Sequence, residues 1–264
     1  MFETLYPEHA IERCTVSLSF DAPVPAKARE KALSALRSDL QGAGFGEGKS
    51  MGFRFGNISG QLKVELDDAP VKFELPSGGI EIVIFPDALI YTTQKYVRWR
   101  PFFGQFRESL SGYMKTVTEI LSMRALRLEY VDRFIWTGSW DDIDYGSLLR
   151  ADSNLIAPLF TQAKKQWHSH AGLFEFPRSA ERRLMQVNVD ATDALSQSGS
   201  QPSIGILTLI QDEFIGANNS ENRFKEFEGC MDAVEELHVS SKDLFSRVIV
   251  ADMAARINLN SRGS

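Results

Sequence analysis

Several segments of the chain alternate hydrophobic and polar residues, a pattern that predicts strands with one buried face. Residues 13–20 have an apolar residue at every second position, namely Cys14, Val16, Leu18 and Phe20. Similar runs occupy 51–57, 60–66, 71–75, 80–85 and 88–94, separated by turns such as Asp-Asp-Ala-Pro and Pro-Ser-Gly-Gly. Connections as short as these predict an antiparallel meander.

Three other segments repeat apolar residues every three or four positions, which is the period of a helix with one buried face. The first begins after Pro25, ends at Gly42 and carries Leu33, Leu36 and Leu40. The second begins at Pro101 and carries Phe103, Phe106, Leu110, Tyr113, Val117 and Ile120. The third and longest is predicted over 221–257, with Phe224, Phe227, Met231, Val234, His238, Phe245 and Val248 on one face.

The order of these elements predicts an α+β fold. A strand over 125–136 follows the second helix, and strands over 165–176, 182–190 and 204–212 precede the third. Helices and strands come in blocks, which favours antiparallel meander sheets packed against long amphipathic helices. We expect two similar sheet-plus-helix halves, 1–137 and 138–264, packed as one compact unit and divided at the loop that begins at residue 137.

The composition of the chain is that of an ordinary globular protein. It has 264 residues, of which 43% are hydrophobic, and a formal net charge of −6, which argues against direct binding of nucleic-acid phosphates. Its two cysteines form neither a disulfide framework nor a zinc site. The first residues lack the pattern of a signal peptide, and the apolar stretch 80–91 is too short to cross a membrane. We therefore expect a cytoplasmic protein that does not bind membranes.

Residues 43–50, Ala-Gly-Phe-Gly-Glu-Gly-Lys-Ser, satisfy a relaxed phosphate-loop pattern. A phosphate loop needs a strand before it and a helix after it, so that the helix N-terminus faces the anion. Here the predicted helix comes first and the predicted strand follows. We therefore interpret these residues as a helix-to-strand turn, and the sequence indicates no cofactor.

Two groups of residues could bind a metal ion. His168 and His170 are two positions apart in a predicted strand and so share one face, with Asp190 or Asp193 as a possible third ligand. The alternative is a polar, half-exposed strand face. Residues 141–144 gather three carboxylates, which suit magnesium but more often provide turn and helix-capping oxygens. We favour the structural interpretation of both groups.

Residues 94–103, Gln-Lys-Tyr-Val-Arg-Trp-Arg-Pro-Phe-Phe, interleave basic and aromatic side chains. Such a pattern can stack nucleic-acid bases and pair with phosphates. Alternatively, Trp99 and its neighbouring aromatic residues anchor the helix that follows, while Arg98 and the other basic residues face solvent. The acidic balance of the chain favours this second interpretation.

Asp132 occupies an unusual place in the predicted strand 125–136. It shares a strand face with the apolar residues Leu126, Leu128, Tyr130, Phe134 and Trp136. A buried, ionised carboxylate is unfavourable unless it is paired or hydrogen-bonded. Two interpretations stay open: a β-bulge turns Asp132 outward, or Asp132 is a polar anchor in a pocket between sheet and helix.

The chain resembles a sporadically distributed prokaryotic family of about 250 residues. The resemblance rests on Tyr96-x-x-Trp99-x-x-Phe102, the helix after it, and the strand from Leu126 to Phe134. The family has a strand close to Leu-Arg-Tyr-Ile-Asn-Arg-Ile, so this chain carries Asp132 where the family usually has Asn. The family has no assigned activity, and its scattered distribution implies mobile genes of antiviral defence or toxin–antitoxin loci.

Because the sequence has no Gly-x-Ser-x-Gly elbow or His-Glu-x-x-His helix, we do not expect an enzyme. Our leading hypothesis is a non-enzymatic interaction subunit of a bacterial multi-protein system, with a protein partner and possible homo-oligomerisation. The alternative is a small-ligand-binding module with a pocket between curved sheet and helix. A metal-dependent enzyme that uses His168, His170 and Asp190 is the third hypothesis. The candidate binding residues are Asp132, Arg133, Tyr130, Trp99 and Arg98.

Overall fold

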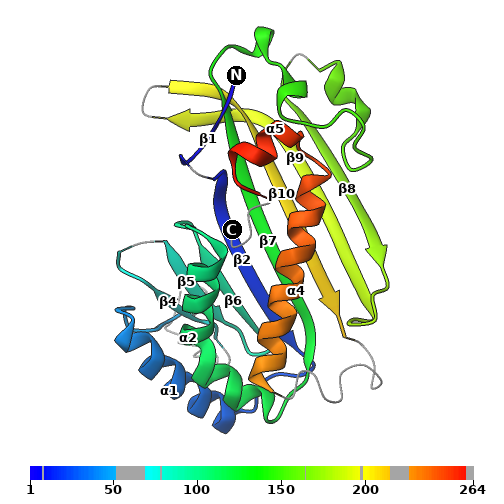
Figure 1. The fold of residues 1–264 in the computed structure, drawn as a ribbon. Coiled ribbons are helices and arrows are strands. Elements are labelled where there is room, and N and C mark those ends of the chain that lie inside the picture. The colour runs from blue at the N-terminus through cyan, green and yellow to red at the C-terminus, as the bar shows by residue number, and fades with distance from the viewer. Residues whose placement is uncertain are drawn as a thin grey trace, which may run out of the picture.

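A large antiparallel sheet with helices packed on one face forms the body of the protein (Figure 1). The computed structural model describes residues 1–7, 9–51, 69–77, 79–163, 165–196, 199–214 and 226–259. Within these ranges the fold is α+β with an antiparallel sheet, as the order of the predicted elements indicates. No helix in the described part of the chain has both the length and the apolar character needed to cross a membrane.

The sheet contains ten strands within the described ranges. They are β1 (Phe2–Thr4), β2 (Ile11–Phe20), β3 (Lys49–Ser50), β4 (Val71–Glu74), β5 (Ile80–Ile84), β6 (Ala88–Thr93), β7 (Met123–Trp136), β8 (Trp167–Glu175), β9 (Arg182–Ser196) and β10 (Gly199–Glu213). Nine strands follow the order β3-β4-β5-β6-β2-β7-β10-β9-β8, and β1 pairs with the far end of β7. Strand β7 is an interior strand that joins the N-terminal strands to β10.

Four α-helices are described: α1 (Ala26–Gly42), α2 (Trp99–Thr118), α4 (Phe227–Ser246) and α5 (Ala251–Arg256). In Figure 1, α1 and α2 lie over the β4-β5-β6-β2 part of the sheet, whereas α4 runs along β7 and β10. Short 3-10 helices occur at Trp140–Asp142, Tyr145–Ser147 and Pro158–Thr161. The long helices thus cover one face of the sheet side by side.

Most of the predicted elements are present, with ends that differ by a few residues. The predicted strands 51–57 and 60–66 lie almost entirely outside the described residues. The second helix begins at Trp99 rather than Pro101, and Ile120 lies beyond its end and is 49% exposed. The division of the chain at residue 137 stays a prediction, although strands from both segments pair in one sheet.

The prediction of one continuous C-terminal helix over 221–257 is wrong. Helix α4 ends at Ser246, and α5 begins at Ala251. Between them Ile249 forms a β-bridge with Leu149, and Val250 N–H donates to the carbonyl of Leu148 at 2.9 Å. The segment Val-Ile-Val at 248–250 is β-branched throughout, which favours extended backbone over helix. The three- and four-residue spacing of apolar residues continues through this segment, so that spacing alone does not reveal the break between the two helices.

The two faces of the sheet differ sharply in polarity. On β2 the buried residues alternate with polar residues that face solvent, and β7 shows the same pattern over most of its length. The inner face, under the helices, carries the core, and the outer face carries ion pairs such as Arg133 Nε to Glu12 Oε2 at 2.8 Å. This is the pattern of an antiparallel sheet with one solvated face.

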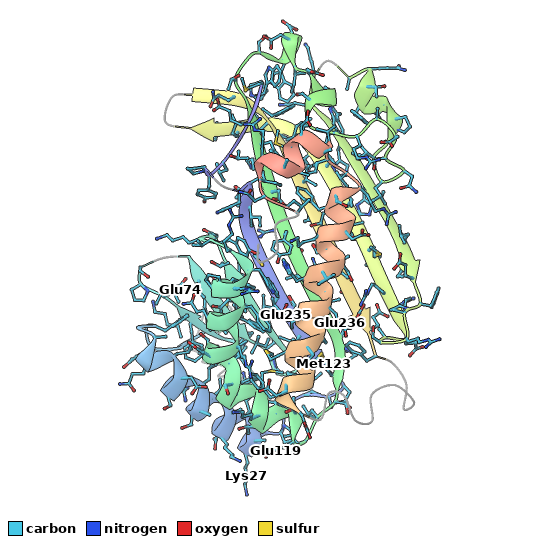
Figure 2. All side chains as sticks on the ribbon, in the orientation of Figure 1. Lys27, Glu74, Glu119, Met123, Glu235 and Glu236 are labelled. Carbon is cyan, nitrogen blue, oxygen red and sulfur yellow. The ribbon has the colours of Figure 1, made fainter. Side chains whose placement is uncertain are left out.

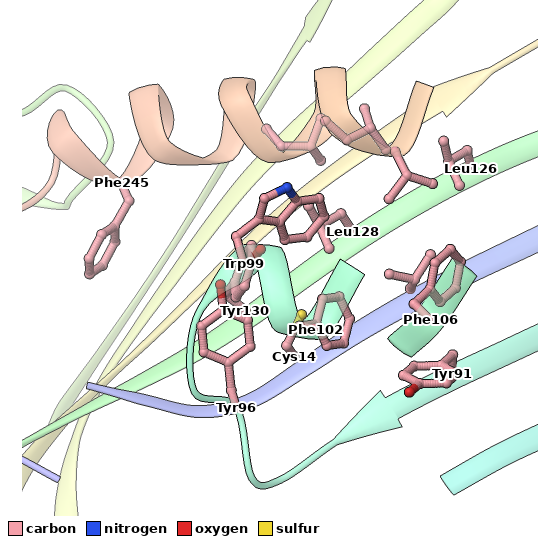
Figure 3. Close-up of a cluster of buried hydrophobic side chains, with 14 of the residues drawn as sticks. Cys14, Tyr91, Tyr96, Trp99, Phe102, Phe106, Leu126, Leu128, Tyr130 and Phe245 are labelled. Carbon is pink, nitrogen blue, oxygen red and sulfur yellow. The ribbon is translucent and has the colours of Figure 1, made fainter. Parts of the chain in front are cut away.

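Aromatic rings fill the space between α2 and the inner face (Figure 3). The ring of Tyr91 packs edge-on against Phe102 and Phe106, with centroid distances of 5.8 and 5.2 Å. Tyr96, from the segment that leads into α2, packs edge-on against Tyr130 of β7 at 5.8 Å. Edge-to-face pairs of this kind add stability beyond that of apolar burial alone. The N-terminal part of α2 is therefore anchored firmly on the sheet.

Helices α1 and α2 pack closely, with Lys27 of α1 and Glu119 after α2 at the same end of the molecule (Figure 2). A Cβ atom at Gly112 would lie 2.9 Å from Cβ of Ala35 and 2.8 Å from Oδ2 of Asp39. We expect Gly112→Ala to lower the free energy of unfolding by about 1–3 kcal/mol, because the helices must move apart.

Gly104 provides the matched control on the same helix, because a Cβ there has no neighbour within 4 Å. Gly104→Ala should instead raise stability by about 0.5–1 kcal/mol through helix propensity. Urea denaturation of both variants checks the pair. Equal effects of the two substitutions would contradict the close packing at Gly112.

Candidate functional site

A cavity lies on the inner face of the sheet, between β7, β10 and α4. Its volume is about 60 Å³, and it opens to solvent. This volume has room for a few water molecules or a small chemical group. The segment before α2, the start of β2 and the residues after α5 complete the wall.

Asp132 lies on the wall of this cavity and is 4% exposed. Its position follows from the alternation of β7, which places residues 130, 132 and 134 on the inner face. No described residue forms an ion pair or a hydrogen bond with its carboxylate, whose burial raises the pKa to about 8. A carboxyl group in this environment is mostly protonated at pH 7.

The structure contains a bulge next to Asp132, but on the neighbouring strand. The register between β2 and β7 shifts between Ile11 and Arg13, directly opposite Asp132. The extra residue is in β2, so β7 keeps its alternation and Asp132 stays on the inner face. The structure therefore places Asp132 in the pocket between sheet and helix rather than turning it outward.

Tyr130 connects the cavity wall to α4. Its hydroxyl lies 3.0 Å from Nδ1 of His238, and both side chains are buried. The indole of Trp99 stacks on the imidazole of His238, with ring centroids 3.9 Å apart and nearly parallel planes. Trp99 Nε1 donates to Oε2 of Glu235 at 2.9 Å, so both a ring contact and a hydrogen bond hold the indole. This network holds α2, α4 and β7 together beside the cavity.

Basic residues also line the cavity, without pairing with Asp132. They are Arg98 from the segment before α2, Lys242 from α4 and His9 from the segment before β2. Burial lowers the pKa of Lys242, and burial raises the pKa of Asp132, so both groups shift toward their neutral forms. The hydroxyls of Thr208 and Ser241 complete the polar part of the wall. The cavity thus has an acidic and a basic part.

Four of the candidate residues lie in or beside this cavity, and the fifth does not. Asp132, Tyr130 and Arg98 line the cavity, and Trp99 packs behind it against His238. Arg133 lies on the outer face, where its guanidinium contacts Glu12 and donates to Oγ of Ser203 at 3.2 Å. Strand alternation forbids Arg133 and Asp132 from sharing one site.

The candidate metal ligands lie on the outer face of the sheet. Nδ1 of His168 is 2.5 Å from Oδ1 of Asp190, directly across the β8–β9 pair, and both side chains are about half exposed. His170 is opposite Asn188 and is exposed. Within the described ranges, no group of three or more His, Cys, Asp or Glu residues is placed to hold a metal ion.

The other motifs have structural roles. Residues 43–50 link α1 to β3, in the order helix then strand that the turn interpretation predicts. In the carboxylate-rich loop, Oδ1 of Asp142 accepts a hydrogen bond from Trp136 Nε1 at 2.9 Å. Oδ1 of Asp144 caps the next turn by accepting from Gly146 N–H. Trp99 and Phe102 are buried, so these aromatic rings do not form an exposed stacking surface.

Sequence reasoning missed the contribution of α4 and of His9 to the cavity. His238, Ser241, Lys242 and Phe245 are spaced by three and four residues, so all of them face the sheet side of the helix. The sequence did contain an indication of this site, because the polar residues His238, Ser241 and Lys242 interrupt the apolar stripe of α4. Without knowledge of the strand order, nothing showed that these polar residues lie opposite Asp132.

Tyr130→Phe tests whether the bond to His238 stabilises the site. The substitution keeps the ring but removes the hydroxyl that lies 3.0 Å from His238 Nδ1. We expect the free energy of unfolding to fall by about 1–3 kcal/mol, since a buried polar atom loses its partner.

The matched control is Tyr113→Phe. The Tyr113 hydroxyl is also buried, but it has no hydrogen-bond partner among the described residues. Its removal should therefore cost no stability. Thermal denaturation of the two variants side by side distinguishes the hydrogen bond from a general effect of losing a hydroxyl, and equal Tm changes would contradict a stabilising role of the Tyr130–His238 bond.

No family model matches the chain, and no curated protein matches it. This result is consistent with the resemblance to a family that has no assigned activity.

Proposed function

We propose that the protein binds a small ligand in the cavity between β7, β10 and α4. The observation that supports this proposal is the carboxyl group of Asp132, which lines the cavity, is 4% exposed and has no partner among the described residues. Burial of a carboxyl group is far more unfavourable than burial of a hydroxyl group, so a buried carboxyl group without a partner calls for an explanation. A bound ligand that supplies the missing partner explains it.

The surroundings of Asp132 also support a ligand site. Concave, largely apolar sites with a few convergent polar groups are typical of small-molecule binding. Here Phe245, Ile257 and Ala10 provide apolar surface, while Thr208 and Ser241 provide hydroxyls. A strongly shifted pKa caused by burial in a cleft is a further property of functional carboxyl groups.

The first experiment is thermal denaturation of the protein with pools of metabolites and lipids, followed by native mass spectrometry of each stabilising pool. A binding ligand should raise Tm, and the increase should grow with ligand concentration. The stabilisation should be lost or reduced in Asp132→Asn and retained in Asp190→Asn, a control on the outer face. Absence of any stabilising pool, or equal stabilisation of both variants, would contradict ligand binding at this cavity.

A second proposed function is that of an interaction subunit, and the edge strand β8 favours it. Strand β8 is at the end of the described strand order, where an antiparallel partner strand could pair. Two large apolar residues are exposed at its C-terminal end, Phe174 at 51% and Phe176 at 76%. In this proposal a partner protein of the same bacterial system, of antiviral defence or toxin–antitoxin type, adds a strand to β8.

Affinity purification from the native host, with nuclease treatment, tests the interaction proposal. We expect a stoichiometric protein partner that the substitution Phe176→Glu releases. Leu195→Glu is the control, because Leu195 is 90% exposed near the C-terminal end of β9, whereas Phe174 pairs with Leu184 near the start of β9. Recovery of the chain alone, or release by both substitutions alike, would contradict docking at β8.

A further inference from the structure

We infer that the cavity binds a small zwitterion, whose positively charged nitrogen pairs with Asp132 and whose anionic group is bound by Arg98 and Lys242. This inference rests on the proposed ligand-binding function and names the class of ligand. The arrangement that carries it is one buried carboxylate and two basic side chains that line a single cavity without pairing with that carboxylate.

The acidic part of the cavity suits a protonated amine. An ammonium group has three N–H donors and needs acceptors. The carboxylate of Asp132 on β7 and the hydroxyl of Thr208 on the neighbouring strand β10 are such acceptors, and Ser241 provides a further hydroxyl from α4. The aromatic rings of Tyr96 and Tyr130 line the cavity beside them, and aromatic rings attract cations. An amine therefore finds opposite charge and hydrogen-bond acceptors together.

The basic part of the cavity excludes a ligand that is only cationic. Arg98 and Lys242 would repel an amine that carries no negative charge, whereas both favour a carboxylate or phosphate on the same molecule. Each of them offers several N–H donors, so an existing contact within the protein still leaves donors for a ligand. Once an ammonium group has ionised Asp132, the cavity holds opposite charges at its two parts, and these match a zwitterion better than an ion of either sign.

Asp132, Tyr96 and Arg98 line one cavity, so one small molecule can contact its acidic and basic parts together. Burial is the main cause of the raised pKa of Tyr96, and among the smaller causes the carboxyl of Asp132 raises this pKa and the guanidinium of Arg98 lowers it. The cavity, of about 60 Å³ and open to solvent, suits a ligand the size of an amino acid, part of which extends toward solvent.

The experiment compares complete zwitterions with their halves. The probes are the protein amino acids, each with its decarboxylated amine and its deaminated acid, such as leucine, 3-methylbutylamine and 4-methylpentanoate. At least one amino acid should raise Tm more than either of its halves. Its affinity should fall about tenfold or more in Asp132→Asn and in Lys242→Met, but not in Asp190→Asn.

Calorimetry in buffers of different ionisation enthalpy gives a second readout. Pairing with an ammonium requires ionised Asp132, so binding at pH 7 should release close to one proton in the unaltered protein and none in Asp132→Asn. Comparing proton release by the two proteins distinguishes the proton of Asp132 from protons of the other titratable or charged side chains nearby. These are His9, Cys14, Tyr96, Arg98, Tyr130, His238 and Lys242.

Three results would overturn the inference: no amino acid raises Tm, an amine or acid alone matches the zwitterion, or binding releases no proton. These results leave the proposed function standing if another compound from the metabolite pools stabilises the protein and Asp132→Asn abolishes that effect. Only the failure of all pools removes the proposed function as well.

Discussion

Replacement of Asp132 by Asn is expected to stabilise the protein at neutral pH, and the gain should grow as the pH rises from about 4 to about 8. The carboxyl group is buried without a partner in the described structure, so the folded state favours its protonated form. In the unfolded chain the same group ionises near its ordinary pKa of 3.8. Asn keeps the shape of the side chain but cannot ionise.

The direction of the effect follows from proton binding. Between the unfolded pKa and the folded pKa of about 8, the folded state holds a proton that the unfolded state has released. Stability therefore falls as the pH rises through this window, and the loss is complete above the folded pKa. Each tenfold difference in proton affinity between the two states corresponds to about 1.36 kcal/mol, so stability should fall between pH 4 and pH 7 by roughly 4 kcal/mol at most.

Urea denaturation of the unaltered protein and of Asp132→Asn at several pH values between 4 and 9 measures this effect. The amide of Asn adds an offset that does not depend on pH, so the decisive quantity is the slope of the stability difference. Asp141→Asn is the control: Asp141 is exposed, and its replacement should change stability by less than about 0.5 kcal/mol at any pH. A stability difference that is constant with pH would show that Asp132 is ionised or paired in the folded protein.

The ion pair between Arg183 and Asp212 should show the second large effect. Arg183 Nε and Nη2 contact the two carboxylate oxygens of Asp212 at 2.6 and 2.7 Å, and Arg183 Nη1 donates to Oγ of Ser240 on α4. The side chains are only 10% and 4% exposed. Asp212→Leu or Arg183→Leu alone should lower stability by about 3–5 kcal/mol, because each leaves a buried charge without its partner.

The double variant Arg183→Leu with Asp212→Leu completes the test. Replacing a buried ion pair by apolar residues is often close to neutral, so the double variant should be more stable than either single variant. Chemical denaturation of all four proteins gives the coupling energy directly. If the losses of the two single variants simply add in the double variant, the pair does not act as a unit.

The inner and outer faces of the sheet could be predicted from the sequence, because strand alternation depends only on neighbouring residues. The alternation of β7 placed Asp132 among apolar residues, but only the register between β2 and β7 and the observed burial decided between an inward position and an outward bulge. The same reasoning could have excluded Arg133 from a shared site, since adjacent residues of a strand point to opposite faces.

The residues around Asp132 could not be predicted, because they come from segments far apart in the chain. His9 precedes β2, Arg98 precedes α2, and Lys242 lies on α4. The residues next to each of them in the sequence give no sign that it lines a cavity. Only the pairing of β7 with both β2 and β10 brings their segments to one cavity.

The sequence by itself therefore determined the class of fold, most of the elements and the face on which each strand residue lies. These properties depend on periodicity and turn residues, which act over a few positions along the chain. The tertiary structure alone decided the strand order, the break between α4 and α5, and the cavity around Asp132. Those features depend on contacts between residues far apart in the chain, such as Tyr130 with His238, which are 108 positions apart, and no local pattern encodes such contacts.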